Sequence, residues 1–292
     1  SSPTDQAQTS TLLGQYSKRV KWNWSLAPPP SRTSVDQSLA SLKDSAPGKD
    51  GVPKCAWKNC GDTGGDILFR LLEHLTHAKP PPPEFNWGLW IFPAKKVKET
   101  DPSTLKVVRS PLETRPLVLN DEDNKIVAGV AAHAVGPVLQ DCANACQRGF
   151  IKGRQLIDNP VILDTHARIS AMQCMNNRGV HYFSSPLQPH LVAELAVTAL
   201  FDYASAFSSV NHQWLFQVLQ SAKAPDGFIN IVKSRYIDCQ AFIKNESSHD
   251  FLFKVSSGVL QGCPLSSVLF VMCIDPLLWL FSSLLVFHGH GH

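Results

Sequence analysis

The chain has 292 residues, of which 43% are hydrophobic and 17% charged, a composition that excludes a disordered chain and predicts a globular protein with a sizeable core. The net charge of +3 is only mildly basic, so charge alone does not identify a nucleic-acid-binding protein. The eight cysteines stand in apolar or helical contexts, which favours reduced thiols in an intracellular protein over a disulfide framework.

Residues 1–45 are rich in Ser, Thr, Gln and Pro and show weak periodicity, which predicts a polar linker or N-terminal extension with one helix. Farther along, apolar residues recur at helical spacing after Asp62, and this pattern predicts an amphipathic helix that ends before Pro80. The aromatic and β-branched segment from Trp87 to Pro93 predicts a strand.

The second half of the chain alternates helical and strand patterns. A helix rich in Ala and Val is predicted from Ile126 to Val135, and a strand buried on both faces from Ala193 to Phe201. Trp214 to Leu219 is typical of a second amphipathic helix, and Cys239 to Ile243 with Phe251 to Val255 of a hairpin. Because no strict βαβ repeat is present, the predicted fold class is α+β.

The apolar stretch from Val268 to Phe287 raises the question of a membrane span. Asp275 and Pro276 interrupt it, and residues 277–287 are too few to cross a bilayer. We therefore predict a pair of buried helices here and no membrane partner.

Two segments carry residues suited to catalysis or ligand binding. In the first, Asp202 follows the predicted buried strand and precedes small residues, a place where a carboxylate can hold a metal ion. The second, Ser257 to Ser266, is a turn with two glycines that carries Gln261 and leads into an apolar helix. Glycines there let the backbone approach a ligand closely.

In this order, the two segments resemble motifs A and B of reverse transcriptases of the non-LTR retrotransposon (LINE-like) branch. Upstream, residues 46–53 resemble the Pro-Gly-x-Asp-Gly-Ile/Val-Pro segment of that branch, and Arg115-Pro116-Leu117 with Asn124-Lys125 resembles its Arg-Pro-Ile segment. Residues 147–154 are similar to its Gln-x-Gly-Phe-x-x-Gly-Arg block. Five motifs in the correct order, from Ala46 to about Leu278, are far more specific than any one of them.

The resemblance implies a right-hand polymerase fold, with fingers over residues 46–190 and a partial palm, incomplete at the C-terminus, over residues 191–292. The implied partners are an RNA template, a DNA primer and dNTPs, and the implied location is nuclear or cytoplasmic. The implied chemistry is RNA-dependent DNA synthesis with two Mg²⁺ ions.

The resemblance also assigns roles residue by residue. Asp202 matches the catalytic, metal-binding Asp of motif A, and Tyr203 lends its backbone carbonyl. Phe207 matches the aromatic that favours dNTPs over NTPs, with Ala206 leaving the nucleotide room. The remaining nucleotide-binding positions are Gln261 and Gly262 of motif B and Arg115, which matches an arginine that grips the triphosphate. Five further cations are either nucleic-acid contacts or ordinary surface charge: Lys95, Lys96, Arg148, Lys152 and Arg154.

The sequence departs from the family after motif B. The family completes its metal site with an aromatic-x-Asp-Asp turn, and here Asp275 is the only acid after Gln261. One carboxylate cannot hold two divalent ions. We therefore expect a polymerase fragment, inactive as this chain alone, that needs the missing palm and thumb. The alternatives are a non-catalytic scaffold that binds RNA or protein and, as a third option, a group II intron maturase.

Three other clusters have both a functional and a purely structural interpretation. Cys55, Cys60, His74 and His77 approach a zinc-finger spacing, although surface histidines and two core thiols explain them better. Residues 121–123 form an acidic cluster that we interpret as a solvated turn before a helix. The histidines of residues 288–292 match no trusted ligand spacing.

Overall fold

The computed structural model describes residues 3–41, 45–95, 110, 113–178, 205–246 and 248–285. Asp202, Tyr203, Lys96, the strand predicted at residues 193–201 and the C-terminal histidines lie outside these ranges. The chain divides into two compact units, one made of residues 1–144 with 205–292 and the other of residues 145–204. This division differs from the functional one into fingers and palm, which stays a prediction.

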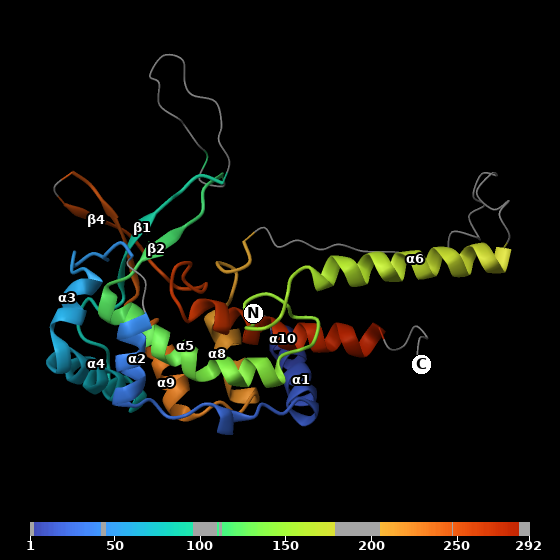
Figure 1. Ribbon diagram of the computed structural model, residues 1–292, viewed down its shortest axis with the longest axis horizontal. Coiled ribbons are helices and arrows are strands. Elements are labelled where there is room, and N and C mark those ends of the chain that lie inside the picture. Colours follow the sequence, from blue (N-terminus) through green and yellow to red (C-terminus); the bar gives the residue numbers. More distant parts are fainter. Residues whose placement is uncertain are drawn as a thin grey trace, which may run out of the picture. The chain divides into compact units, whose positions relative to one another are not determined.

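The larger unit combines helices with one four-stranded sheet (Figure 1). The strands are β1 (Trp87–Ile91), β2 (Leu117–Leu119), β3 (Gln240–Lys244) and β4 (His249–Lys254). Their order is β2-β1-β3-β4, with β1 parallel to β3 and the other neighbours antiparallel. The predicted strand after Pro83 and the predicted hairpin are confirmed, and so is the α+β class.

The larger unit contains eight described α-helices, of which α4 begins near the start signal predicted at Asp62. They are α1 (Pro3–Arg19), α2 (Arg32–Ser41), α3 (Lys54–Asn59), α4 (Gly61–Thr76), α5 (Glu122–Cys142), α8 (His212–Ser221), α9 (Asp226–Ser234) and α10 (Ser266–Leu285), with a 3-10 turn at Trp24–Leu26. The smaller unit contains α6 (Asp158–Arg178). The predicted helices at residues 62–75, 126–135 and 214–219 are confirmed as α4, part of α5, and α8.

Helical periodicity predicts α4 correctly because its apolar face is needed for packing. Leu68, Leu72 and Leu75 are fully buried, and α4 packs against α2 and α9. The helix α5 is longer than predicted and contains Pro137. Most of its first half is buried, including the polar residues Asn124 and Lys125, so it is a core helix of the unit.

The prediction of a linker over residues 1–45 is wrong. Two helices form there, and Leu13, Tyr16, Val35 and Leu39 are buried in the core of the larger unit. The apolar residues are few and widely spaced, so the local pattern is weak although each of them packs against other elements.

The predicted break at Asp275 and Pro276 is also wrong, because α10 runs without interruption through both residues. Pro276 lies inside the helix, and Asp275 is buried by contacts with other elements. Among the described helices, α10 alone is long and apolar enough to cross a membrane, and 44% of its 18-residue apolar window is buried within the protein. It packs against α8, α5 and α1.

The acidic cluster at residues 121–123 does precede a helix, but it is not a solvated turn. Glu122 is buried, and Asp121 and Asp123 are half-buried. Glu122 accepts a hydrogen bond from the Lys125 ammonium at 2.7 Å, and the Ser45 hydroxyl also donates to it. The cluster is therefore part of the interior packing around the start of α5.

Candidate functional site

The segment after motif A and the motif B turn lie side by side in the larger unit. The Gly258 N–H donates to the Val210 carbonyl at 2.7 Å, and the Val259 N–H donates to the Phe207 carbonyl at 2.9 Å. Gly258 has φ +89°, and a Cβ there would lie 3.0 Å from the backbone of Ser208. Only glycine fits this approach without strain, so the first glycine of the motif joins the two segments.

The second glycine of the turn lies against β2. Gly262 has φ +105°, and a Cβ there would lie 2.5 Å from the Val118 carbonyl oxygen. The Val118 N–H donates to the Gln261 carbonyl at 2.8 Å. These contacts bring Gln261 and Gly262 next to the strand that follows Arg115, so residues from two distant motifs share one region.

Arg115 lies two residues before β2, at the end of the β1–β2 pair where the connecting segment begins. Its N–H donates to the Pro93 carbonyl at 2.9 Å, and its side chain is exposed. An antiparallel bridge between Ala94 and Thr114 places Lys95, also exposed, close to Arg115 at the same end of this pair. Two exposed cations therefore lie on the segments that extend β1 and β2, near the strand that contacts Gln261.

Phe207 is held by the helix that follows motif B. Its ring stacks on Phe270 of α10, with ring centroids 4.9 Å apart. Phe207 and Ala206 are both half-buried, so each keeps a surface that a ligand can contact. The arrangement gives the aromatic ring a defined orientation.

Behind the motif B turn lies a buried polar network that sequence reasoning missed. Arg235, which follows α9, donates to the Asn124 carbonyl at 3.1 Å, to Asn124 Oδ1 at 2.5 Å and to Cys263 Sγ at 3.4 Å. Arg235 and Asn124 are buried, and Cys263 directly follows Gly262. No local motif marks Arg235, and the only available signal is a cation at the end of an apolar amphipathic helix.

A second polar cluster holds residues 45–51, which we term the Gly48 loop. A Cβ on Gly48 would lie 2.2 Å from Asp121 Oδ1, and the same oxygen accepts a hydrogen bond from the Asp50 N–H at 3.1 Å. The Lys125 ammonium donates to the Ala46 carbonyl at 2.9 Å. The motif pair Asn124-Lys125 is therefore structural, since Lys125 anchors the loop and Asn124 belongs to the network behind the turn.

Burial raises the pKa of Asp121 to about 7, and the nearby carboxylates of Asp50 and Asp123 contribute in the same direction. The Asp50 N–H opposes this rise by stabilising the carboxylate. Burial likewise raises the pKa of Asp123, against the lowering effect of Asn124 N–H and of the Arg235 guanidinium. The start of α5 thus holds carboxyl groups that resist ionisation.

Lys49 of the Gly48 loop lies over two aromatic rings of the sheet. Its ammonium is 4.6 Å from the ring centroid of Trp87 and 4.9 Å from that of Phe242. It also pairs with Glu84 at 3.0 Å. These contacts fix the side chain against the protein.

In the smaller unit, the partners of Arg148 and Arg154 are local. Arg148 pairs with Asp158 at 3.1 Å, and Arg154 Nη1 donates to the Gln147 carbonyl at 2.8 Å. Lys152 is exposed. The structure therefore gives Arg148 and Arg154 local structural roles and brings none of the three together with Arg115 within one unit.

Asp202, Tyr203 and Lys96 lie outside the described residues. Within the described ranges, no group of three or more His, Cys, Asp or Glu side chains gathers as a metal ion would require. Asp275 accepts hydrogen bonds from the Tyr16 hydroxyl at 2.6 Å and the Asn144 N–H at 2.7 Å, and it is 1% exposed. It is a buried structural carboxylate.

The four residues of the zinc-finger-like spacing do not act together. His74 Nε2 lies 2.8 Å from the Pro80 carbonyl, and His77 Nδ1 lies 2.7 Å from the Glu73 carbonyl. Cys55 and Cys60 are exposed, so the expectation of two core thiols is wrong.

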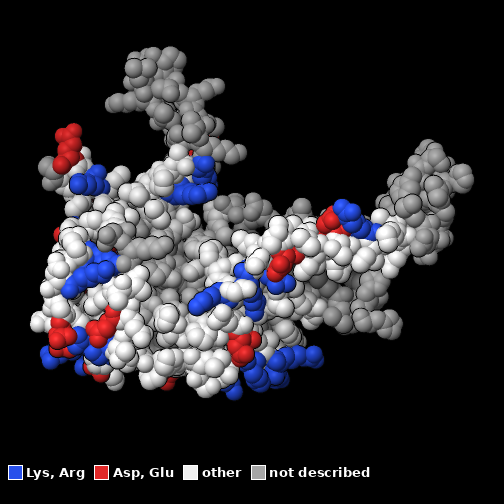
Figure 2. Space-filling model, in the orientation of Figure 1, with Lys and Arg blue, Asp and Glu red and all other residues white. Residues whose placement is uncertain are grey.

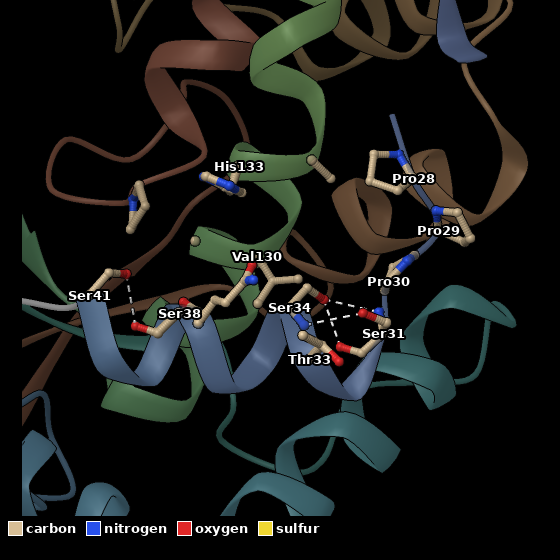
Figure 3. A pocket seen from close by; sticks show the side chains of 14 residues that line it. Pro28, Pro29, Pro30, Ser31, Thr33, Ser34, Ser38, Ser41, Val130 and His133 are labelled. Carbon is tan, nitrogen blue, oxygen red and sulfur yellow. Dashed lines mark hydrogen bonds between the residues drawn. The ribbon is translucent and has the colours of Figure 1, made fainter. Parts of the chain in front are cut away.

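A cavity of about 740 Å³ lies between the Pro28–Pro30 run, α2 and α5 (Figure 3). Several of its hydroxyls are engaged within their own segment, since Ser34 bonds with Ser31, and Ser41 donates to the Ser38 carbonyl. Among the described residues that line it, His133 is the one ionisable group. The surface charges on the face drawn in Figure 2 are mixed, with acidic groups beside many of the basic ones. Neither feature has the chemistry of a catalytic centre.

Comparison of the sequence with known proteins finds a matching family and related proteins. The profile of the family described as reverse transcriptase (RNA-dependent DNA polymerase) matches residues 108–287. The chain is 28% identical over 166 residues to the transposon TX1 uncharacterized 149 kDa protein of Xenopus laevis, covering 57% of this chain and 11% of that protein. It is 24% identical over 234 residues to the retrovirus-related Pol polyprotein from type-2 retrotransposable element R2DM of Drosophila melanogaster, covering 80% of this chain and 19% of that protein. The chain thus spans less than a fifth of either relative.

Proposed function

The chain belongs to the reverse transcriptase family, in its non-LTR retrotransposon (LINE-like) branch, and from this premise we propose that it forms the incoming-nucleotide pocket of an RNA-templated DNA polymerase. In this proposal residues 46–190 belong to the fingers and residues 191–292 to part of the palm. The observation that carries it is the contact between the Gln261–Gly262 turn and β2, the strand that follows Arg115.

The proposed pocket has a cationic side and an aromatic side. Arg115, with Lys95 beside it, faces solvent and binds the triphosphate of the incoming dNTP. Gln261 and Gly262 contact the nucleotide and the templating base, with Gly262 allowing close approach. Phe207, oriented by Phe270, lies against the sugar and disfavours a 2′-hydroxyl. Ala206 leaves the nucleotide room, and Tyr203 contributes its carbonyl.

Phosphoryl transfer demands positioning and charge neutralisation more than covalent chemistry from the protein. The contacts of Gly258 and Gly262 supply the positioning, because they hold the segment after motif A, the motif B turn and β2 together. Reverse transcriptases in general bind an RNA template, a primer and dNTPs, and we propose these partners for the element's complete protein, with no membrane partner.

Reverse transcriptases generally use Mg²⁺, and we propose Asp202 as a ligand of two such ions, which neutralise charge on the reacting phosphates. The described residues alone do not make such a site, since Asp275, the only acid after Gln261, is engaged by Tyr16 and Asn144. We propose that further carboxylates, outside the described residues, complete the site. We propose that this chain alone is inactive.

The proposal is tested by primer extension on an RNA template with Mg²⁺ and dNTPs, using the element's complete protein. We expect Asp202→Asn to abolish extension, by about a thousandfold or more, because a metal ligand is lost. Asp226→Asn, a substitution of the same kind at the exposed start of α9, is the control and should keep activity. Extension that survives Asp202→Asn would overturn the metal-ligand assignment, and a wild-type protein without extension would favour the non-catalytic scaffold.

A further inference from the structure

We propose that Arg235 is a positioning residue of the nucleotide pocket, which fixes the Gln261–Gly262 turn through Cys263 and Asn124. This inference rests on the proposed function of that turn. Its basis is the buried polar network behind the turn, which joins α5, the residues after α9, the loop before β1 and motif B.

Arg235 is a buried cation with neutral hydrogen-bond acceptors. Arg235 is 3% exposed, and its guanidinium donates to two oxygens of Asn124 and to the sulfur of Cys263. Removing a charged group from water is costly, and a methionine would fill similar space without that cost. The nearby Asp123 carboxylate, whose pKa the Arg235 guanidinium lowers, offsets part of this cost. Charge by itself does not require a guanidinium, whereas the planar, directional donors of a guanidinium suit a positioning role.

Asn124 is the hub of the network. Its amide nitrogen donates to the Phe85 carbonyl at 2.7 Å and to Asn86 Oδ1 at 3.3 Å, and its oxygen accepts from Asn120 at 2.7 Å as well as from Arg235. The side chain is fully buried, so each of these bonds forms in a low-dielectric interior where it is strong and directional. Asn124 thus has one orientation, which it imposes on Arg235.

The network closes back on the segment that carries Arg235. Asn86, itself buried, donates to the carbonyls of Ser234 and Ile237 at 2.7 and 2.8 Å. These two residues lie on either side of Arg235 in the sequence. Asn86 therefore fixes the backbone on either side of Arg235, and Asn124, which bonds to Asn86, fixes its guanidinium.

The turn is held from two sides. On one side the Val118 N–H bonds to the Gln261 carbonyl, and Gly262 lies against the Val118 carbonyl. On the other side Arg235 contacts Cys263, the next residue. Because Gly262 has a backbone conformation that most residues avoid, small shifts at Cys263 are expected to change where the Gln261 side chain points. Arg235 therefore acts on the nucleotide through Gln261, without touching it.

The test is Arg235→Lys in the element's complete protein, which keeps the charge but loses the planar set of donors. We expect the KM for dNTP to rise about tenfold while kcat changes by less than about twofold, because a small displacement weakens nucleotide binding. Arg70→Lys, at an exposed position of α4, is the matched control and should change neither constant. An unchanged KM in Arg235→Lys would overturn the proposal.

A double-mutant cycle with Gln261→Asn distinguishes the positioning of Gln261 by Arg235 from a purely structural role of Arg235. If Arg235 acts through Gln261, Arg235→Lys should raise the KM in that background by less than about twofold. Equal effects in both backgrounds would show a general destabilisation and overturn the proposal. If Arg235→Lys is not recovered folded, Cys263→Ala takes its place, with an expected KM increase of about threefold.

Hydrogen exchange measured on this chain gives a readout that does not require catalysis. We expect Arg235→Lys to speed exchange in the peptide that covers residues 257–266 and to leave the β3–β4 hairpin unchanged. If the wild-type protein shows no primer extension, the proposed function is rejected, and so is the role of Arg235 in dNTP binding. Unchanged exchange at residues 257–266 would reject the positioning network itself.

Discussion

Gly262 shows how one residue decides the geometry of the candidate site. Its φ of +105° lies in a region that residues with a Cβ rarely adopt, and its missing side chain leaves space for the Val118 carbonyl. A sequence pattern identifies this glycine as part of motif B. The partner that requires it, Val118, lies far away in the sequence and is known only from the fold.

We predict that Gly262→Ala destabilises the chain by about 2–4 kcal/mol, because the methyl group meets a backbone oxygen and the conformation becomes strained. The melting temperature should fall by several degrees in a thermal melt followed by circular dichroism. Gly136→Ala is the matched control, since a Cβ there meets no atom within 4 Å and Gly136 lies inside α5. Equal melting temperatures for Gly262→Ala and wild type would contradict the packing described for the turn.

At the scale of elements, the start of α5 organises the Gly48 loop. Asp121 accepts the Asp50 N–H, and Glu122 and Lys125 form a buried pair that also bonds Ser45 and Ala46. Local acidity suggested a solvated turn, because the sequence does not show that residues 45–51 cover this helix end. Asp121, Glu122 and Lys125 are shielded from solvent because the Gly48 loop packs on the start of α5.

The raised pKa of Asp121 predicts a pH dependence of stability. A carboxyl with a higher pKa in the folded than in the unfolded chain binds its proton more tightly when folded. Its contribution to the free energy of unfolding therefore falls as pH rises from about 4 to about 7 and is level above that range. Asp121→Asn keeps an oxygen acceptor for the Asp50 N–H but cannot ionise.

We accordingly expect the melting temperature of Asp121→Asn, relative to wild type, to increase between pH 5 and pH 8. Thermal melts at a series of pH values in constant ionic strength measure this difference. Asp226→Asn, at the exposed start of α9, should show a difference from wild type that does not vary in this way. A constant difference for Asp121→Asn as well would refute the burial argument.

For the larger unit as a whole, a buried polar contact joins the two ends of the described chain. The Tyr16 hydroxyl in α1 donates to Asp275 in α10 and accepts from Trp22 Nε1 at 2.8 Å. Burial, followed by the Asp275 carboxylate, raises the pKa of Tyr16 far above its usual range, so the phenol stays protonated and donates. The N-terminal helix is thus an integral part of this unit.

We predict that Tyr16→Phe lowers the free energy of unfolding by about 1–3 kcal/mol, because a buried carboxylate loses a hydrogen-bond donor. Denaturant titration of the chain measures the change. Tyr236→Phe, which removes the same hydroxyl from a second, partly buried tyrosine, serves as the control. A loss no larger than that of the control would show that α1 is not held through Asp275.

The sequence by itself determined the family, the α+β class and the positions of α4, α8, β1 and the β3–β4 hairpin. These features depend on local order: motif spacing, a single apolar face, or alternation between turn residues. Local patterns suffice there because the spacing of apolar residues within each element indicates which of its faces is buried.

Only the tertiary structure decided what Arg235, Asn124 and Asp275 do, that the apolar residues of α1 and α2 pack into the core, and that α10 continues through Pro276. In each case the deciding partner lies far away in the sequence: Cys263 for Arg235, Tyr16 for Asp275. A buried polar group is stable only when distant segments supply its hydrogen bonds, and sequence alone does not show which segments meet.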